Sequence, residues 1–149
     1  MGTYIPLLFL AIAAGFCLPT QAGVNANLNL LTRSSILSAA ISFAVGTIVL
    51  VIYALILKTP LPAAESISRS PWWIWIGGII GAFFVVSTII LAPRLGAGAM
   101  VASVVAGQML ASMVLDHFGF IGYPVHPIST LRLVGVIMLF GGVILIRWF

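Results

Sequence analysis

The chain has 149 residues, of which 62% are hydrophobic and only 5% are charged, and its formal net charge is +4. So little polar surface excludes a water-soluble globular domain and indicates an integral membrane protein. The positive charges are dispersed rather than clustered, which argues against a nucleic-acid partner and favours single anchors at the membrane interface.

Five apolar segments are long enough to cross a membrane, so the sequence predicts an all-α protein with five transmembrane helices. They cover residues 4–28, 35–57, 72–92, 96–115 and 131–148. At about twenty residues each they use about a hundred residues, which leaves no room for a separate catalytic domain. Residues 1–149 are therefore expected to form a single membrane domain, with loops or turns at 29–34, 58–71, 93–95 and 116–130.

The six Lys and Arg residues divide equally between the two membrane faces that five spans create. The face of the N-terminus carries Lys58, Arg69 and Arg132, and the opposite face carries Arg33, Arg94 and Arg147. An excess of positive residues in cytoplasmic loops normally sets orientation. This balance therefore predicts dual topology, in which two oppositely inserted copies pair as an antiparallel homodimer with inverted symmetry. The alternative is a single orientation set by other signals.

The first span is expected to be retained, because no Lys or Arg precedes it and it lacks a small-residue cleavage site. Its Cys17, the single cysteine, is predicted to be a small buried packing residue. Pro19 removes a backbone donor inside the span, and Gln21 and Asn25 follow on one helical face. Amides in hydrocarbon need partners, so this face either bonds to another helix or contacts a substrate.

Small residues recur at helical spacing in the third and fourth spans. The third span has the GxxxG pair Gly77 and Gly81, and the fourth has Ala99, Ser103, Gly107 and Ala111 at every fourth position. Such patterns let helices approach closely, so these positions are predicted to pack against other helices. Whether the same surfaces also slide during a conformational change stays open.

The fourth span also carries a polar face of Gln108, Ser112 and Asp116. The Gln108 amide can both donate and accept hydrogen bonds, which suits either a binding cavity or a contact between helices. Asp116 adjoins His117, and the two together favour proton coupling, because an imidazole exchanges protons near neutral pH. A solvated helix end is the alternative. Metal-ligand spacing, a phosphate-binding loop and a convincing nucleophile are missing, so neither an enzyme nor a cofactor is expected.

Three segments of the chain carry a resemblance to a known family: LPTQAGVNANL, PWWIWIGGIIGAFFVV and GQMLASMVLDHFGFIG. Their order and spacing resemble the YdcZ-like five-span inner-membrane proteins of the drug/metabolite transporter (DMT) superfamily. The resemblance covers nearly the whole chain and implies half of a ten-helix inverted-repeat fold. It also implies a central cavity, to which it assigns Gln21, Asn25, Trp75, Gly78, Gln108 and Asp116.

The resemblance further implies a multi-pass protein of the cell inner (plasma) membrane, in contact with lipid, that transports a small metabolite or drug by alternating access. The first span lacks the glutamate that four-span multidrug exporters of the superfamily use there. This departure favours neutral or zwitterionic substrates over cations. A dual-topology ion or small-solute channel, or a membrane interaction protein without transport activity, are the alternatives.

Overall fold

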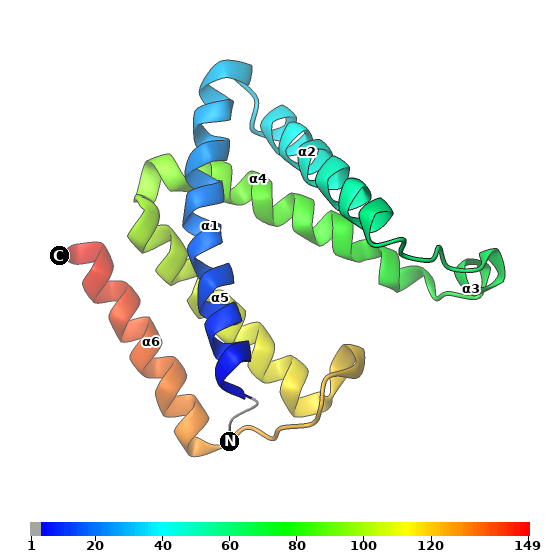
Figure 1. Cartoon of the computed structure of the whole chain (residues 1–149). Coiled ribbons are helices and arrows are strands. Elements are labelled where there is room, and N and C mark those ends of the chain that lie inside the picture. The colour runs from blue at the N-terminus through cyan, green and yellow to red at the C-terminus, as the bar shows by residue number, and fades with distance from the viewer. Residues whose placement is uncertain (1–3) are drawn as a thin grey trace. The chain divides into compact units, whose positions relative to one another are not determined.

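The computed structural model describes residues 4–149, and every regular element in that range is a helix (Figure 1). In chain order these are α1 (Tyr4–Thr32), α2 (Ser35–Ile56), α3 (Ala64–Ser68), η1 (Trp72–Ile76), α4 (Gly77–Leu95), α5 (Ala97–Phe118), η2 (Phe120–Gly122) and α6 (Thr130–Trp148). Five segments, with η1 counted together with α4, are long and apolar enough to cross a membrane. The predicted all-α, five-span architecture is confirmed.

The helices differ from the predicted spans mainly at the connections. α1 continues to Thr32 and α4 continues through Pro93 to Leu95, so the first and third connections are shorter than predicted. Gly96 ends α4 at a φ of +79°, a region that glycine adopts without steric cost. The prediction that residues 58–71 form only loops is wrong, because they contain the short helix α3.

The chain forms two compact units, of which the first ends at Pro93 and the second is Arg94–Phe149. In the first unit, α1 and α2 form a helical hairpin. Ser34 caps α2 by accepting a hydrogen bond from the N–H of Leu37 at 3.2 Å. The hydroxyl oxygens of Thr32 and Ser38 lie 2.6 Å apart and join the two helix ends.

The apolar core of the first unit is small. Ala39 on α2 clusters with Val85 and Ile89 on α4, and Ile89 is fully buried. Gly81 lies against Phe43, whose Cζ would be 3.5 Å from a Cβ added at the glycine. Most large apolar side chains are exposed, as expected where lipid, rather than a protein core, covers the helices.

The remaining predicted packing residues differ in exposure. Ala99 is buried, whereas Gly77, Ser103, Gly107 and Ala111 are exposed. A Cβ added at Gly77 or Gly107 would meet nothing within 4 Å. Close packing of these four exposed residues therefore stays a prediction.

Cys17 is exposed, so the prediction that it is a buried packing residue is wrong. Every described residue of α1 up to Cys17 is exposed, and the first buried residue is Ala22. The sequence could not show this difference, because lipid and a protein interior are equally apolar and select the same side chains.

In the second unit, α5 and α6 form an antiparallel hairpin joined by residues 119–129. Gly98, near the start of α5, lies beside Ile146, near the end of α6. Gly119 ends α5 in the left-handed region at a φ of +64°. Ser129 caps α6 by accepting a hydrogen bond from the N–H of Arg132 at 3.3 Å.

Candidate functional site

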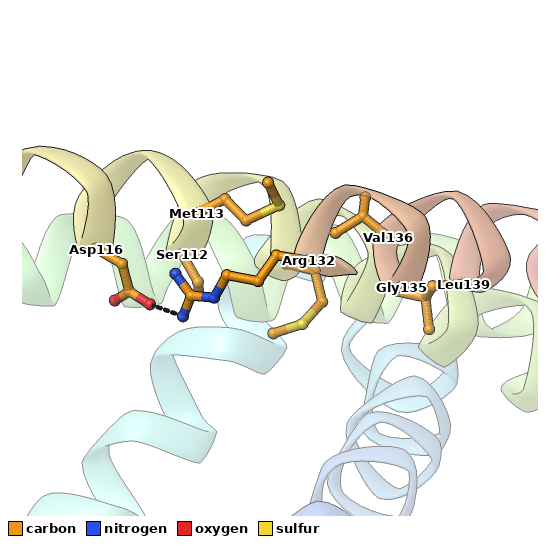
Figure 2. Close-up of a pocket in the computed structure, with 8 residues that line it drawn as sticks. Ser112, Met113, Asp116, Arg132, Gly135, Val136 and Leu139 are labelled. Carbon is orange, nitrogen blue, oxygen red and sulfur yellow. Dashed lines mark hydrogen bonds and ion pairs between the residues drawn. The ribbon is translucent and has the colours of Figure 1, made fainter. Parts of the chain in front are cut away.

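A pocket with a volume of about 310 Å³ lies between α5 and α6 (Figure 2). Its walls are mainly apolar and consist of Met109, Met113, Gly135, Val136 and Leu139. Its polar lining consists of Ser112, Asp116 and Arg132. Figure 2 shows the charged groups near Ser112 at one end, while Leu139 lies farther along α6. The pocket is therefore amphipathic along its length.

An ion pair forms the charged end of the pocket. The Nη2 atom of Arg132 lies 2.7 Å from Oδ2 of Asp116, and Nη1 donates to the carbonyl oxygen of His126 at 2.9 Å. The Arg132 and Asp116 side chains are 37% and 22% exposed, respectively. Hydrogen bonds between ionised groups are stronger than neutral ones, so this contact fixes the start of α6 against the end of α5.

The loop between α5 and α6 positions Arg132 by returning over the end of α5. The N–H of His126 donates to the carbonyl oxygen of Asp116 at 2.8 Å. The N–H of Ile128 donates to Nδ1 of His117 at 3.2 Å. Asp116 and His117 thus have different partners, and no hydrogen bond joins their side chains in the described part of the chain.

We expect Gly119→Ala to destabilise this loop. The residue has a positive φ, and an added Cβ would lie 2.8 Å from Cγ2 of Val125, which is too close. A left-handed conformation costs about 1–2 kcal/mol for residues other than glycine. Thermal unfolding of the purified protein should show a lower midpoint. Gly141→Ala in α6 is the matched control, because a Cβ there meets nothing. Equal midpoints for the two variants would contradict the prediction.

The polar face predicted on α5 is divided in the structure. Ser112 and Asp116 line the pocket, whereas Gln108 is exposed and does not line it. Ser87 and Ser103, which also lie inside helices, donate to the carbonyl oxygen four residues earlier. Within residues 4–149, the Ser112 hydroxyl makes no such bond to a backbone carbonyl oxygen. It is therefore able to bond to a ligand in the pocket.

The first unit has a groove of about 240 Å³ between α1 and α2, which Gln21 lines together with Ser42 and Thr47. Asn25, one turn farther along α1, is only 3% exposed. Its Nδ2 atom has no hydrogen-bond partner in the described part of the chain, and neither has Oδ1 of Asn29. Buried amides without partners are costly, so both side chains have an unsatisfied polar atom in the described part of the chain.

The resemblance also assigned Trp75 and Gly78 to a central cavity, but neither residue lines the α5–α6 pocket or the groove between α1 and α2. Trp75 lies in η1 and is 59% exposed, and Gly78 lies in the first turn of α4 and is also exposed. A role for either residue in binding therefore stays a prediction.

Sequence reasoning missed the pairing of Arg132 with Asp116, and it treated the cations as single interfacial anchors. Arg132 and Arg69 are each ion-paired rather than single, and Nη2 of Arg69 lies 2.7 Å from Oε1 of Glu65. Their role as interfacial anchors stays a prediction. A usable signal was present, because both acidic residues fall on the same predicted membrane face as these arginines. Opposite charges confined to one face are the natural partners.

The five apolar helices and their exposed apolar side chains define a multi-pass membrane protein, and α5 and α6 hold its amphipathic pocket. The chain belongs to the family described as "Putative inner membrane exporter, YdcZ", which it matches over residues 6–145. It is similar to the Inner membrane protein YdcZ of Escherichia coli (strain K12), with 33% identity over 127 residues. This similarity covers 85% of the chain and 84% of the relative. No solved structure matches the chain.

These comparisons confirm the family resemblance and a multi-pass location in the inner membrane, in contact with lipid. The family description supports a general role in transporting a small molecule across that membrane, and it points to a transporter rather than an enzyme. Among the described residues, no group of three or more His, Cys, Asp or Glu side chains could hold a metal ion.

Proposed function

We propose that the protein transports a small metabolite or drug by alternating access, as an antiparallel homodimer of two oppositely inserted copies. Each copy supplies five helices, so that the pair forms a ten-helix transporter with inverted symmetry. The preferred substrates are neutral or zwitterionic, because α1 has no carboxylate for binding a cation.

The observation that carries this proposal is the equal division of six cations between the two membrane faces, combined with an odd number of spans. Equal charge leaves orientation without a strong signal, and an odd number of spans lets an inverted copy act as the other half. Exposed small residues on α4 and α5 support it, since small residues are typical of surfaces where helices pack closely.

The proposed roles of individual residues follow from this arrangement. Five residues contact the substrate in the central cavity of the dimer: Gln21, Asn25, Trp75, Gly78 and Gln108. Asp116 and His117 couple transport to protons. The exposed small residues of α4 and α5 pack at surfaces that shift as the cavity opens to either side.

Cysteine labelling from each side of the membrane tests the dual orientation. Cys17 is replaced by Ala, and one new cysteine is added after Phe149. Cells are then treated with a membrane-impermeant maleimide before or after disruption. With almost no charge bias, we expect about half of the cysteine tags to react in intact cells and the rest only after disruption.

A second preparation with the cysteine at the N-terminus is the control, because an odd number of spans places the two termini on opposite faces. Under dual topology, both tags give the same partial labelling in intact cells. Labelling of one terminus alone, with the other protected until disruption, would show a single orientation and overturn the proposal.

A further inference from the structure

We infer that the pocket between α5 and α6 binds a zwitterionic small molecule with an apolar side chain. The anionic group of the ligand pairs with Arg132, its ammonium group pairs with Asp116, and its side chain lies among the apolar residues beyond them. None of the five residues proposed to contact the substrate in the dimer cavity lines this pocket, so the inference assigns a further binding site within one chain; it rests on the proposed function for its physiological meaning. The pocket itself belongs to a single compact unit of one chain.

Both members of the ion pair keep free hydrogen-bonding groups. A guanidinium has five N–H donors, and Arg132 uses its side-chain donors for two bonds, one to His126 and one to Asp116. Asp116 accepts through Oδ2, and no described residue donates to its Oδ1. The hydroxyl of Ser112 adds a third free group at the same end of the pocket. Unused groups of both charges therefore lie within one partly exposed site.

The charges decide which ligand fits. An anion alone would be attracted by Arg132 but repelled by Asp116, and a cation alone would experience the reverse. A zwitterion places each of its charges beside the opposite charge and leaves the original ion pair intact. Charge interactions a few ångströms apart are strong in a partly dehydrated site, so this complementarity should dominate selection.

The apolar residues of the pocket determine which side chain the zwitterionic ligand can have. Met109, Met113, Val136 and Leu139 offer only apolar contacts. Methionine side chains are flexible and adapt to differently shaped groups, so either a branched or an aromatic side chain can be held. A volume of about 310 Å³ lies at the lower end for small-molecule sites and favours a soluble metabolite over a two-tailed lipid.

Binding of matched probes to the purified full-length protein in nanodiscs of phosphatidylglycerol tests the inference. The probes are leucine, phenylalanine, 3-phenylpropionate as the anion alone, 2-phenylethylamine as the cation alone, and glycine as a zwitterion without an apolar side chain. We expect leucine or phenylalanine to bind at least about tenfold more tightly than the other three, measured by calorimetry and thermal shift.

Two variants examine the two ends of the pocket separately. Arg132→Gln should reduce phenylalanine binding at least about tenfold, whereas Arg147→Gln, at the other end of α6, should leave it unchanged. Gly135→Leu should fill the apolar end, because a Cβ at Gly135 meets nothing within 4 Å and the helix can accept it. Gly141→Leu is its control, since Gly141 is equally uncrowded but does not line the pocket.

Absence of binding by both apolar zwitterions, or equal binding of the single-charge probes, would overturn the inference. Unchanged phenylalanine binding in Gly135→Leu would do the same. Weaker phenylalanine binding when phosphatidylethanolamine replaces phosphatidylglycerol would assign the site to a zwitterionic lipid headgroup and also overturn it. Because the pocket lies within one chain, binding should survive even if the dimer is not antiparallel. The labelling experiment and the binding experiment can therefore fail independently.

Discussion

Variants with a strong charge bias should lose self-association when expressed alone and regain it when two oppositely biased variants are expressed together. Lys58→Asn with Arg69→Gln leaves one cation on the face of the N-terminus and three on the other. Arg33→Asn with Arg94→Gln produces the opposite bias. Each variant should insert in a single orientation, because the positive residues now differ threefold between the faces.

The substitutions are chosen to preserve local structure. Arg33 and Lys58 both have a positive φ, of 54° and 50°, and asparagine tolerates this region better than most residues. Arg69 loses its bond to Glu65, but both side chains are more than 70% exposed, and such pairs contribute little to stability. A loss of association would therefore reflect orientation rather than misfolding.

Co-purification of two differently tagged copies measures the association. When both tagged copies carry the same charge bias, the amount of co-purified partner should be at least about tenfold lower than for the wild type. When the two copies carry opposite biases, the amount should equal that of the wild type. Lys58→Asn with Arg94→Gln is the matched control, since it removes one cation from each face and keeps the balance. Full association of each biased variant with itself would exclude an antiparallel dimer.

Removing either partner of the ion pair between α5 and α6 should destabilise the second compact unit. Arg132→Gln leaves the Asp116 carboxylate, which is only 22% exposed, without its cation. Loss of a charge-assisted hydrogen bond of this kind costs about 1–3 kcal/mol, below the value for a fully buried pair because water reaches both groups. Asp116→Asn should have a similar effect on the free energy of unfolding.

A double-mutant cycle isolates the contact from other effects of each substitution. The neutral pair Asp116→Asn with Arg132→Gln should be less destabilised than the sum of the single variants. Glu65→Gln is the control, because it breaks the exposed pair with Arg69 and should change stability by less than about 0.5 kcal/mol. Additive losses in the cycle would show that the 2.7 Å contact contributes no stability.

The architecture could be predicted because the features that determine it are local. Long apolar segments form helices in a membrane, since lipid offers no hydrogen bonds to the backbone. The observed helices accordingly agree with the predicted spans. The errors lie at the ends, where α4 continues through Pro93 until Gly96 stops it. A proline prevents only some helical hydrogen bonds, and a nearby glycine can end the helix instead.

The candidate site was predicted only in part. The sequence singled out Asp116 and Ser112 as polar residues on one face of a helix, and both line the pocket. Gln108 belongs to the same sequence pattern but lies outside it. Helical spacing shows which residues share a face, but the position of the neighbouring helix decides how much of that face is covered.

The sequence by itself determined the number of long apolar helices and their apolar character, because composition and segment length are sufficient for both, and it predicted the equal division of cations between the two faces. Only the tertiary structure decided that Arg132 lies against Asp116 and that Cys17 is exposed. The contact joins residues sixteen positions apart. It depends on the path of a loop through the left-handed turn at Gly119, and on hydrogen bonds that no local pattern encodes.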